Sequence, residues 1–434
     1  MKTNRTKSWT VVLAAVAITA IMPIQTTAAQ TMDRQIRCHI NGQVIDDPAC
    51  HRMLLTVYNT DLRIGSCDTI SVDKDGRFTY DLRTTGNNVY ELIAENDYKN
   101  GSRTIIKFFA ENGTVNIKKY AKATGRKPEM TADCPLNSEM IRLDKLKQDM
   151  FLDKPDRERK MLEESGKVLT PEIQELRKKQ KEAKTNDERK AIGRQLDSLS
   201  RTDKWYSAEY TAACEKYTQA IADHDKYLLE YAKENVTPVG LLYLYQTRRG
   251  TNTADRTEAI YDSLYAGKFS DNIVSRYMRN WIARRKIKPG GRFIDFTAPD
   301  LDGRNHTLSA EIAGHIALID LWASWCGPCR RNSKSMIPIY EEYRDRGFTV
   351  VGVARERSAG PMRKAIDRDG YKWLNLLELN DKALIWEQYG VPNGGGMTVL
   401  VDRDGKILAV NPKADEVRKI LDKVLNREDI SKCK

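Results

Sequence analysis

Residues 316–329 read Ile-Ala-Leu-Ile-Asp-Leu-Trp-Ala-Ser-Trp-Cys-Gly-Pro-Cys, and this stretch decides the fold. Its first seven residues are apolar except for Asp320, a pattern typical of a strand buried on both faces. Cys326 and Cys329 follow, separated by Gly327-Pro328, and a polar, helix-forming segment comes after them. Two cysteines at this spacing can exchange a disulfide with another molecule without a cofactor. Between a strand and a helix, the pair indicates redox chemistry rather than metal binding.

The sequence from residue 292 to residue 427 alternates between strand-like and helix-like segments. Strands are expected at Ala317–Trp322, Thr349–Val353, Thr398–Val401 and Lys406–Val410. Helices are expected from Cys326 to about Asp345, at Met362–Asp369, around Ala383–Tyr389 and at Ala414–Leu425. This alternation predicts a mixed α/β unit at the C-terminal end of the chain.

Residues 317–329 closely resemble the active-site segment of thioredoxin, and residues 292–426 are similar to the TlpA/ResA branch of exported thioredoxin-like proteins. Residues 296–303 match the strand and turn that open that branch, and residues 399–407 match its closing hairpin. The resemblance implies a thioredoxin fold, a mixed sheet flanked by helices. The order of strand-rich, helical and thioredoxin-like segments also looks like a common architecture of Bacteroidetes exported proteins.

The resemblance assigns a role to each residue of the motif. Cys326 is the expected nucleophile, exposed at a helix N-terminus whose N–H groups stabilise a thiolate. Cys329, one turn further on, is the shielded resolving thiol. The Gly327-Pro328 dipeptide implies a reductant. Trp325, Gly327 and Pro328 are expected to face the substrate, together with Gly396 and Met397 of the segment before the closing hairpin.

Asp320 is the candidate acid-base group. A carboxyl in an apolar strand has its pKa raised by desolvation, and it can then take a proton from Cys329 as that thiol attacks. The alternative is a structural acid at a strand end, paired with a lysine or an arginine.

Two positions depart from the pattern of the branch. Its members place a cis-proline just before the closing strand, and here that position is Gly396. A non-proline cis bond costs about 3 kcal/mol, so we expect Gly396 to be trans or mobile, with Pro392 substituting only if the loop is rearranged. A glutamate that the branch uses near the active site falls at Arg357, which leaves the adjacent Glu356 as a candidate.

The first residues have the features of a secretory signal. Lys2, Arg5 and Lys7 precede an apolar segment from Trp9 to Ile24, and small residues at 27–29 suggest cleavage after Ala29. We therefore expect an exported, periplasmic protein with a signal peptide at residues 1–29. An uncleaved N-terminal membrane anchor is the alternative.

The rest of the chain divides by composition. Residues 31–134 contain short β-branched segments separated by Asn-Gly and Asp-Gly turns, including Asn41-Gly42, which predicts a β-sandwich-like domain. Residues 135–287 are rich in helix formers, with one long helix expected from Trp205 to Glu234. Residues 288–434 form the thioredoxin-like domain. The fold class is thus a multidomain α+β protein.

A Cys-His pair occurs twice in the strand-rich segment, at Cys38-His39 and at Cys50-His51. In an oxidising compartment we expect a disulfide between Cys38 and Cys50, with free buried thiols and a zinc site as alternatives. Adjacent strand residues point to opposite faces, so the four side chains do not easily converge on one ion. We predict no metal site and no cofactor.

The formal net charge of +12 does not indicate nucleic-acid binding. Lys/Arg and Asp/Glu are mixed almost evenly over residues 141–200, as on solvated helix faces. The one-signed run, from Arg276 to Arg292, has a single aromatic residue, Trp281, and fits a basic helix end stabilised by the helix dipole.

The sequence therefore predicts an exported thiol–disulfide oxidoreductase that reduces protein disulfides. Its partners would be disulfide-containing client proteins and a membrane or periplasmic thiol reductant as electron donor. A dithiol oxidase or isomerase is an alternative within the same class. The rival from another class is a protein- or glycan-binding protein whose redox domain is secondary. A thioredoxin-like peroxidase is disfavoured, because Ala323 stands where those enzymes hold a threonine.

Overall fold

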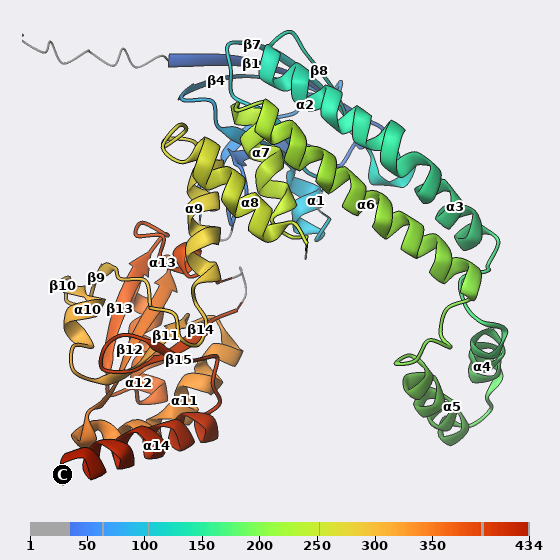
Figure 1. The fold of residues 1–434 in the computed structure, drawn as a ribbon. Coiled ribbons are helices and arrows are strands. Elements are labelled where there is room, and N and C mark those ends of the chain that lie inside the picture. The colour runs from blue at the N-terminus through green and yellow to red at the C-terminus, as the bar shows by residue number, and fades with distance from the viewer. Residues whose placement is uncertain (1–34, 63–64, 103, 251, 392–394, 433–434) are drawn as a thin grey trace, which may run out of the picture.

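The computed structural model describes residues 35–62, 65–102, 104–250, 252–391 and 395–432. Figure 1 shows three parts in chain order: a strand-rich region, a helical region and a C-terminal domain. The predicted signal peptide and Pro392 lie outside the described residues. Within the described part of the chain, no helix has the length and apolar character that a membrane span requires.

The strand-rich region contains two four-stranded sheets. Its elements are β1 (Gln35–Ile45), β2 (Arg52–Val57), β3 (Asp68–Ser71), β4 (Arg77–Thr85), β5 (Val89–Ala94), α1 (Glu95–Lys99), β6 (Ile106–Phe109), β7 (Gly113–Tyr120) and β8 (Glu129–Ala132). One sheet has the order β4-β1-β7-β8 and the other β3-β2-β5-β6. Ile40 and Val115 of the first sheet share a buried cluster with Leu55 and Phe108 of the second. The two sheets therefore enclose one core, as in the predicted sandwich.

The Asn41-Gly42 pair is not a turn, which corrects the sequence interpretation. Both residues lie inside β1, where Gly42 is paired with Phe78 of β4. A Cβ atom on Gly42 would stand 1.9 Å from Cζ of Phe78, so the phenyl ring occupies the place of a side chain. Glycine in a strand can mark such a close approach as well as a turn. By contrast, Gly76 and Gly101 have positive φ angles and lie in turns, as predicted.

The helical region packs against the second sheet of the strand-rich region. Its helices are α2 (Pro135–Leu146), α3 (Asp153–Glu164), α4 (Pro171–Glu182), α5 (Asn186–Leu199), α6 (Ala208–Glu234), α7 (Pro238–Thr247), α8 (Ala254–Ile260) and α9 (Ile273–Arg285). Val89 and Phe109 belong to the same buried cluster as Leu241 of α7. The Tyr277 hydroxyl of α9 donates to the carbonyl oxygen of Tyr58 at 2.9 Å. The two regions thus share a core.

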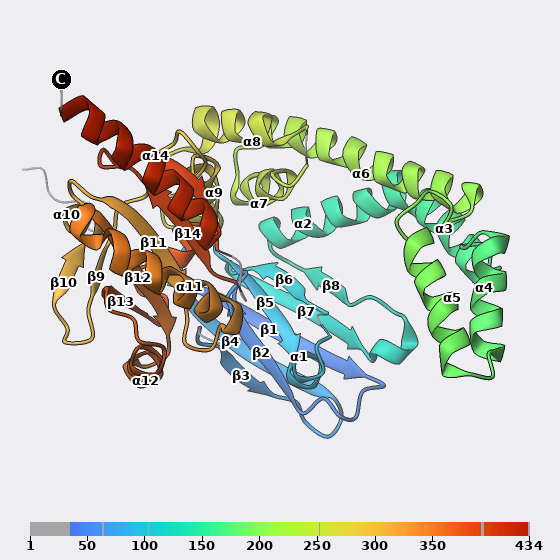
Figure 2. The same cartoon turned by 90° about the horizontal axis from the view of Figure 1, so that it is seen from below.

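The α4–α5 hairpin lies apart from this core. Figures 1 and 2 both show it at the far end of the long helix α6, away from the C-terminal domain. Ile173, Leu176 and Leu196 form a small buried cluster of its own.

The C-terminal domain is a five-stranded mixed sheet with helices. Its elements are β9 (Thr297–Pro299), β10 (Asn305–Thr307), α10 (Leu308–Glu311), β11 (Ile316–Trp322), α11 (Gly327–Tyr343), β12 (Phe348–Glu356), α12 (Ala359–Asp369), β13 (Leu374–Leu379), α13 (Ile385–Gln388), β14 (Met397–Val401), β15 (Ile407–Val410) and α14 (Ala414–Lys432). The order is β13-β12-β11-β14-β15. Strands β11, β12 and β13 are parallel, β14 runs antiparallel to β11, and β15 runs antiparallel to β14. All seven residues of the central strand β11 are buried. The predicted fold class is confirmed.

Candidate active site

The two cysteines of the motif lie at the start of α11, directly after the central strand. They are joined as a disulfide, with their Cα atoms 5.3 Å apart. Cys326 is the N-cap residue of α11, and the backbone N–H of Cys329 points at its Sγ atom, 3.3 Å away. Pro328 fits the first turn, where a backbone N–H has no intrahelical partner. Cys326 thus lies after the turn that follows the central strand, at the positive end of the α11 helix dipole.

Cys326 is less exposed than the sequence predicted. Its exposed fraction is 3%, so the expectation of an exposed nucleophile is wrong for this oxidised form. Cys329, at 8%, is buried as expected. In this form the two sulfurs are bonded to each other, and both cysteines belong to the buried cluster of the domain. Gly327 and Pro328 remain exposed between them, and Trp325 is 45% exposed.

Asp320 lies below the disulfide in a small cavity of about 190 Å³, which Cys329 also lines. The Ser333 hydroxyl lies 2.5 Å from Oδ2 of Asp320 and 3.0 Å from the carbonyl oxygen of Cys329. Burial raises the pKa of the Asp320 carboxyl to about 7, and the hydrogen bond from Ser333 opposes this only in part. Among the described residues Asp320 makes no ion pair, which argues against the purely structural alternative.

Gly396 lies against the resolving cysteine. A Cβ atom there would stand 2.7 Å from Sγ of Cys329 and 2.4 Å from the carbonyl oxygen of Leu321. The described residues contain no cis peptide bond, so Gly396 is trans, as expected. Met397 pairs with Leu321 at the start of β14 and lines the same small cavity. Both predicted residues therefore lie beside the disulfide.

Glu356 supports the loop that leads into the motif. It is buried at the end of β12, where Oε1 accepts a hydrogen bond from the backbone N–H of Ser324 (2.6 Å) and Oε2 accepts one from the Ser324 hydroxyl (2.9 Å). Burial raises its pKa. Glu356 thus holds the residue two positions before Cys326 and does not line the cavity below the disulfide.

Two further polar groups at the site were not among the predicted residues. Ser333 follows Cys329 by four positions, one helical turn, so helical spacing could have identified it. Asn411 accepts a hydrogen bond from the backbone N–H of Thr398 at 3.0 Å and lines the cavity with Cys329. It comes from the loop after β15, and no local pattern connects it to the motif.

The predicted disulfide between Cys38 and Cys50 is absent. Both are free, buried thiols, one in β1 and the other just before β2. The Cys50 thiol points at Sδ of Met53, 3.7 Å away, and His39 pairs with Asp81. The described residues contain no group of three or more candidate ligands that could hold a metal ion. The alternative of free thiols is the one observed.

Comparisons with known proteins concern the C-terminal domain. The family model described as Redoxin matches residues 288–425. The thiol-disulfide oxidoreductase ResA of Geobacillus thermodenitrificans is 27% identical over 156 residues, which are 36% of this chain and 80% of that protein. The thiol:disulfide interchange protein DsbE of Allochromatium vinosum is 32% identical over 116 residues, 26% of this chain and 60% of that protein.

A similar solved structure is the thioredoxin domain of a thiol-disulfide oxidoreductase from Bacteroides vulgatus. It is 28% identical, with a TM-score of 0.29, and the match covers 32% of this chain and 97% of that one. Together, the redoxin match, the ResA and DsbE relatives and the motif at the start of α11 show that residues 288–425 belong to the TlpA/ResA-like thioredoxin family, as a thioredoxin-like thiol–disulfide oxidoreductase.

Proposed function

We propose that this chain is an exported oxidoreductase that reduces disulfides of client proteins through Cys326 and Cys329. The observation that carries the proposal is the placement of the cysteine pair at a helix N-terminus, above a buried carboxyl with a raised pKa. Export rests on the charged and apolar segments of residues 1–29.

The reaction starts from the dithiol form. The Cys326 thiolate attacks one sulfur of the client disulfide, and the other client sulfur leaves as a thiolate that takes up a proton. The products are a mixed disulfide between Cys326 and the client, and one free client thiol. The N–H groups at the start of α11 favour the thiolate form of Cys326.

Resolution is the second step. Asp320 takes the proton of the Cys329 thiol, directly or through a water molecule, for which a cavity of about 190 Å³ has room. Cys329 then attacks Cys326, the mixed disulfide breaks, and the client leaves with both sulfurs reduced. The chain is left with the Cys326–Cys329 disulfide. An external dithiol in the periplasm or membrane must supply the two electrons of the next cycle.

An insulin-reduction assay with dithiothreitol tests the reaction. The Cys326→Ser variant should reduce insulin no faster than dithiothreitol alone, whereas a Cys214→Ser variant, which alters a free thiol outside the motif, should keep full activity. Equal rates for wild type and Cys326→Ser would contradict the proposal.

The direction of electron flow and the identity of the client protein need a second experiment. The Cys329→Ser variant should trap clients on Cys326 as mixed disulfides, which mass spectrometry identifies after expression in the periplasm. Equilibration of the wild-type pair with glutathione gives its reduction potential, and a reductant should lie well below about −180 mV, the potential of disulfide isomerases. A potential at or above that value would favour the oxidase or isomerase alternative.

A further inference from the structure

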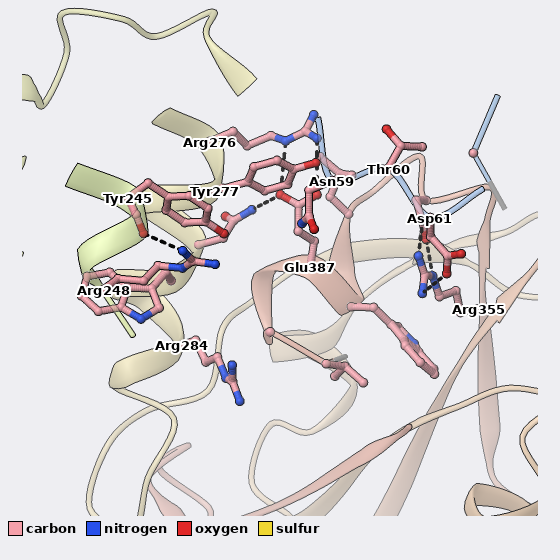
Figure 3. A pocket seen from close by; sticks show the side chains of 18 of the residues that line it. Asn59, Thr60, Asp61, Tyr245, Arg248, Arg276, Tyr277, Arg284, Arg355 and Glu387 are labelled. Carbon is pink, nitrogen blue, oxygen red and sulfur yellow. Dashed lines mark hydrogen bonds and ion pairs between the residues drawn. The ribbon is translucent and has the colours of Figure 1, made fainter. Parts of the chain in front are cut away.

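A second, larger cavity of about 540 Å³ lies where the three parts of the chain meet. Its walls come from the loop after β2, the end of α7, helix α9, and the β13–α13 segment with Arg355 of β12 (Figure 3). This volume is in the range of pockets that hold small organic groups. Nothing in the proposed thiol chemistry uses it.

The walls of this cavity carry more positive than negative charge. Five arginines face three carboxylates across it: Arg248, Arg249, Arg276, Arg284 and Arg355 against Asp61, Asp381 and Glu387. The carboxylates are already engaged, because Glu387 pairs with Arg276 and the two aspartates pair with Arg355. Among the described residues no carboxylate is left over for the other three arginines.

Arg248 is a half-buried cation that pairs with no carboxylate in the part of the chain that the structure describes. Its guanidinium stacks on the Tyr245 ring, 3.4 Å from the centroid, and Nη1 donates to the Tyr245 carbonyl oxygen at 2.5 Å. Burial and the neighbouring Arg249 both lower its pKa. A partly desolvated charge beside a like charge is costly unless an anion joins it.

Arg284 reaches the same cavity from α9. Its side chain crosses over Gly390, where a Cβ atom would stand 2.0 Å from Cδ of the arginine. Gly390 therefore leaves the space through which Arg284 enters the cavity, and Figure 3 shows the Arg284 guanidinium without a drawn partner. This arginine belongs to the basic run of residues 276–292, which charge patterning alone assigned to a helix end.

The cavity is connected to the active site through Trp325. Arg355 and Trp386 line the cavity, and the Trp325 indole N–H donates to the carbonyl oxygen of Arg355 at 3.2 Å. The rings of Trp325 and Trp386 lie 6.1 Å apart. Trp325 immediately precedes Cys326, so a ligand in the cavity and a disulfide at the motif lie on two sides of one tryptophan.

We propose that the arginine cavity binds carboxylate side chains of an acidic segment in the client polypeptide, next to the disulfide that is reduced. Planar guanidinium groups bind carboxylates by two parallel hydrogen bonds, and several of them line this one cavity. The client role rests on the proposed function, whereas binding of the acidic segment is independent of it.

Calorimetric titration of the full, oxidised protein with a cysteine-free hexapeptide of glutamate tests the binding. The peptide should bind at low salt, and Arg248→Gln and Arg284→Gln should each weaken it about tenfold, the order expected for one charge-assisted pair. Arg201→Gln, at an exposed arginine just after α5, is the matched control and should bind as wild type does. Unchanged binding in both cavity variants, or equal binding of a lysine hexapeptide, would overturn the proposal.

Inorganic phosphate serves as the probe for a free anion. If phosphate binds in an arginine-dependent way and the glutamate peptide does not, the cavity is an anion site of another kind and the client role is wrong. In the reductase assay, Arg284→Gln should raise KM for a disulfide peptide with flanking glutamates and leave kcat unchanged. Because the titration contains no redox step, failure of the reductase proposal and failure of the cavity proposal give separate readings.

Discussion

Asp320 is a carboxyl whose surroundings favour its neutral form. It lies in the central strand of the sheet, 3% exposed, and its pKa is raised to about 7 because burial penalises the charge. A group with this pKa can accept a proton from a thiol near neutral pH and release it again afterwards.

The resolution step should depend on the ionisation of Asp320. In wild type, decay of the mixed disulfide should accelerate as pH rises through about 7, where the carboxyl becomes an acceptor. Asp320→Asn should remove this inflection and slow the step by roughly 10²-fold, the usual scale for a general base. Stopped-flow measurement of client release between pH 5 and pH 9 checks this, and an unchanged profile would refute the role.

The same residue should make stability depend on pH. The folded carboxyl holds its proton up to about pH 7, whereas in the unfolded chain it loses the proton near the ordinary value of 3.8. The folded state therefore binds more protons between these values, and stability falls as pH rises. The difference is roughly 4 kcal/mol above pH 7. Asp320→Asn should gain stability over wild type as pH rises from 4 to 8, measured by urea unfolding; a constant difference would contradict this.

Gly396 should tolerate no side chain. In Gly396→Ala the new methyl group would meet the Leu321 carbonyl and the Cys329 sulfur, and overpacking of this kind costs about 1–3 kcal/mol. Gly360→Ala is the control, because nothing lies within 4 Å of its added Cβ. Thermal unfolding of the oxidised proteins should separate the two, and equal melting temperatures would show that the site relaxes freely.

At this scale the motif and its spacing are local, so the sequence could name the cysteine pair, Asp320, Gly396 and Met397, which the structure places next to one another. Their roles in the reaction stay predictions. The sequence did not reveal why residue 396 is glycine, since the reason is a close approach to a strand 75 residues earlier.

Among the elements, the loop between β11 and α11 depends on the end of β12. The side chain of Glu356 satisfies two donors of Ser324 that would otherwise lack partners in a half-buried position. In this way β12, a strand that does not carry the motif, holds the loop that leads from β11 to Cys326.

Removal of the Glu356 carboxylate should make the loop between β11 and α11 more mobile. Glu356→Ala leaves two donors unsatisfied and should cost about 1–3 kcal/mol, with faster hydrogen exchange at the Ser324 amide. Glu356→Gln keeps an acceptor for the amide and should recover part of the loss. Hydrogen exchange monitored by mass spectrometry checks both, and equal protection in all three proteins would rule out this role.

Element prediction succeeded where period and flanking signals agreed. The long helix expected from Trp205 begins at Ala208, after the N-cap Ser207, and ends at Glu234 as predicted. Strands β1, β8, β10 and β13 were not predicted. The polar residues of β1 and its Asn41-Gly42 pair imitate a turn, and the apolar residues of β13 are interrupted by Asn375 and Glu378, which are buried with specific hydrogen-bond partners.

On the scale of the whole molecule, polar contacts between α9 and α13 join the helical region to the C-terminal domain. Glu387 of α13 accepts hydrogen bonds from Asn280 (2.6 Å) and Arg276 (3.2 Å) of α9, residues more than 100 positions away in the chain. No sequence pattern marks such a pairing, so the relative placement of the domains could not be predicted. The predicted boundaries at residues 134 and 287 stay predictions.

Loss of the Glu387 contacts should expose the connection between α9 and the C-terminal domain. Glu387→Ala should accelerate tryptic cleavage at Lys286 several-fold, because local opening controls proteolysis. Glu342→Ala, which removes an ion pair with Arg418 inside the C-terminal domain, is the control and should be cut like wild type. Equal cleavage of the two variants would show that other contacts hold the domains together.

The α4–α5 hairpin leaves and rejoins the molecule at one place. Leu169 and Tyr206 form an antiparallel bridge there, and the backbone N–H of Thr170 donates to the carbonyl oxygen of Trp205 at 3.2 Å. Its buried residues form a cluster separate from the main cores. Residues 170–205 can therefore be deleted or exchanged as one unit. A short turn can replace them, or another module can be inserted in their place, while the ends of α3 and α6 keep their positions.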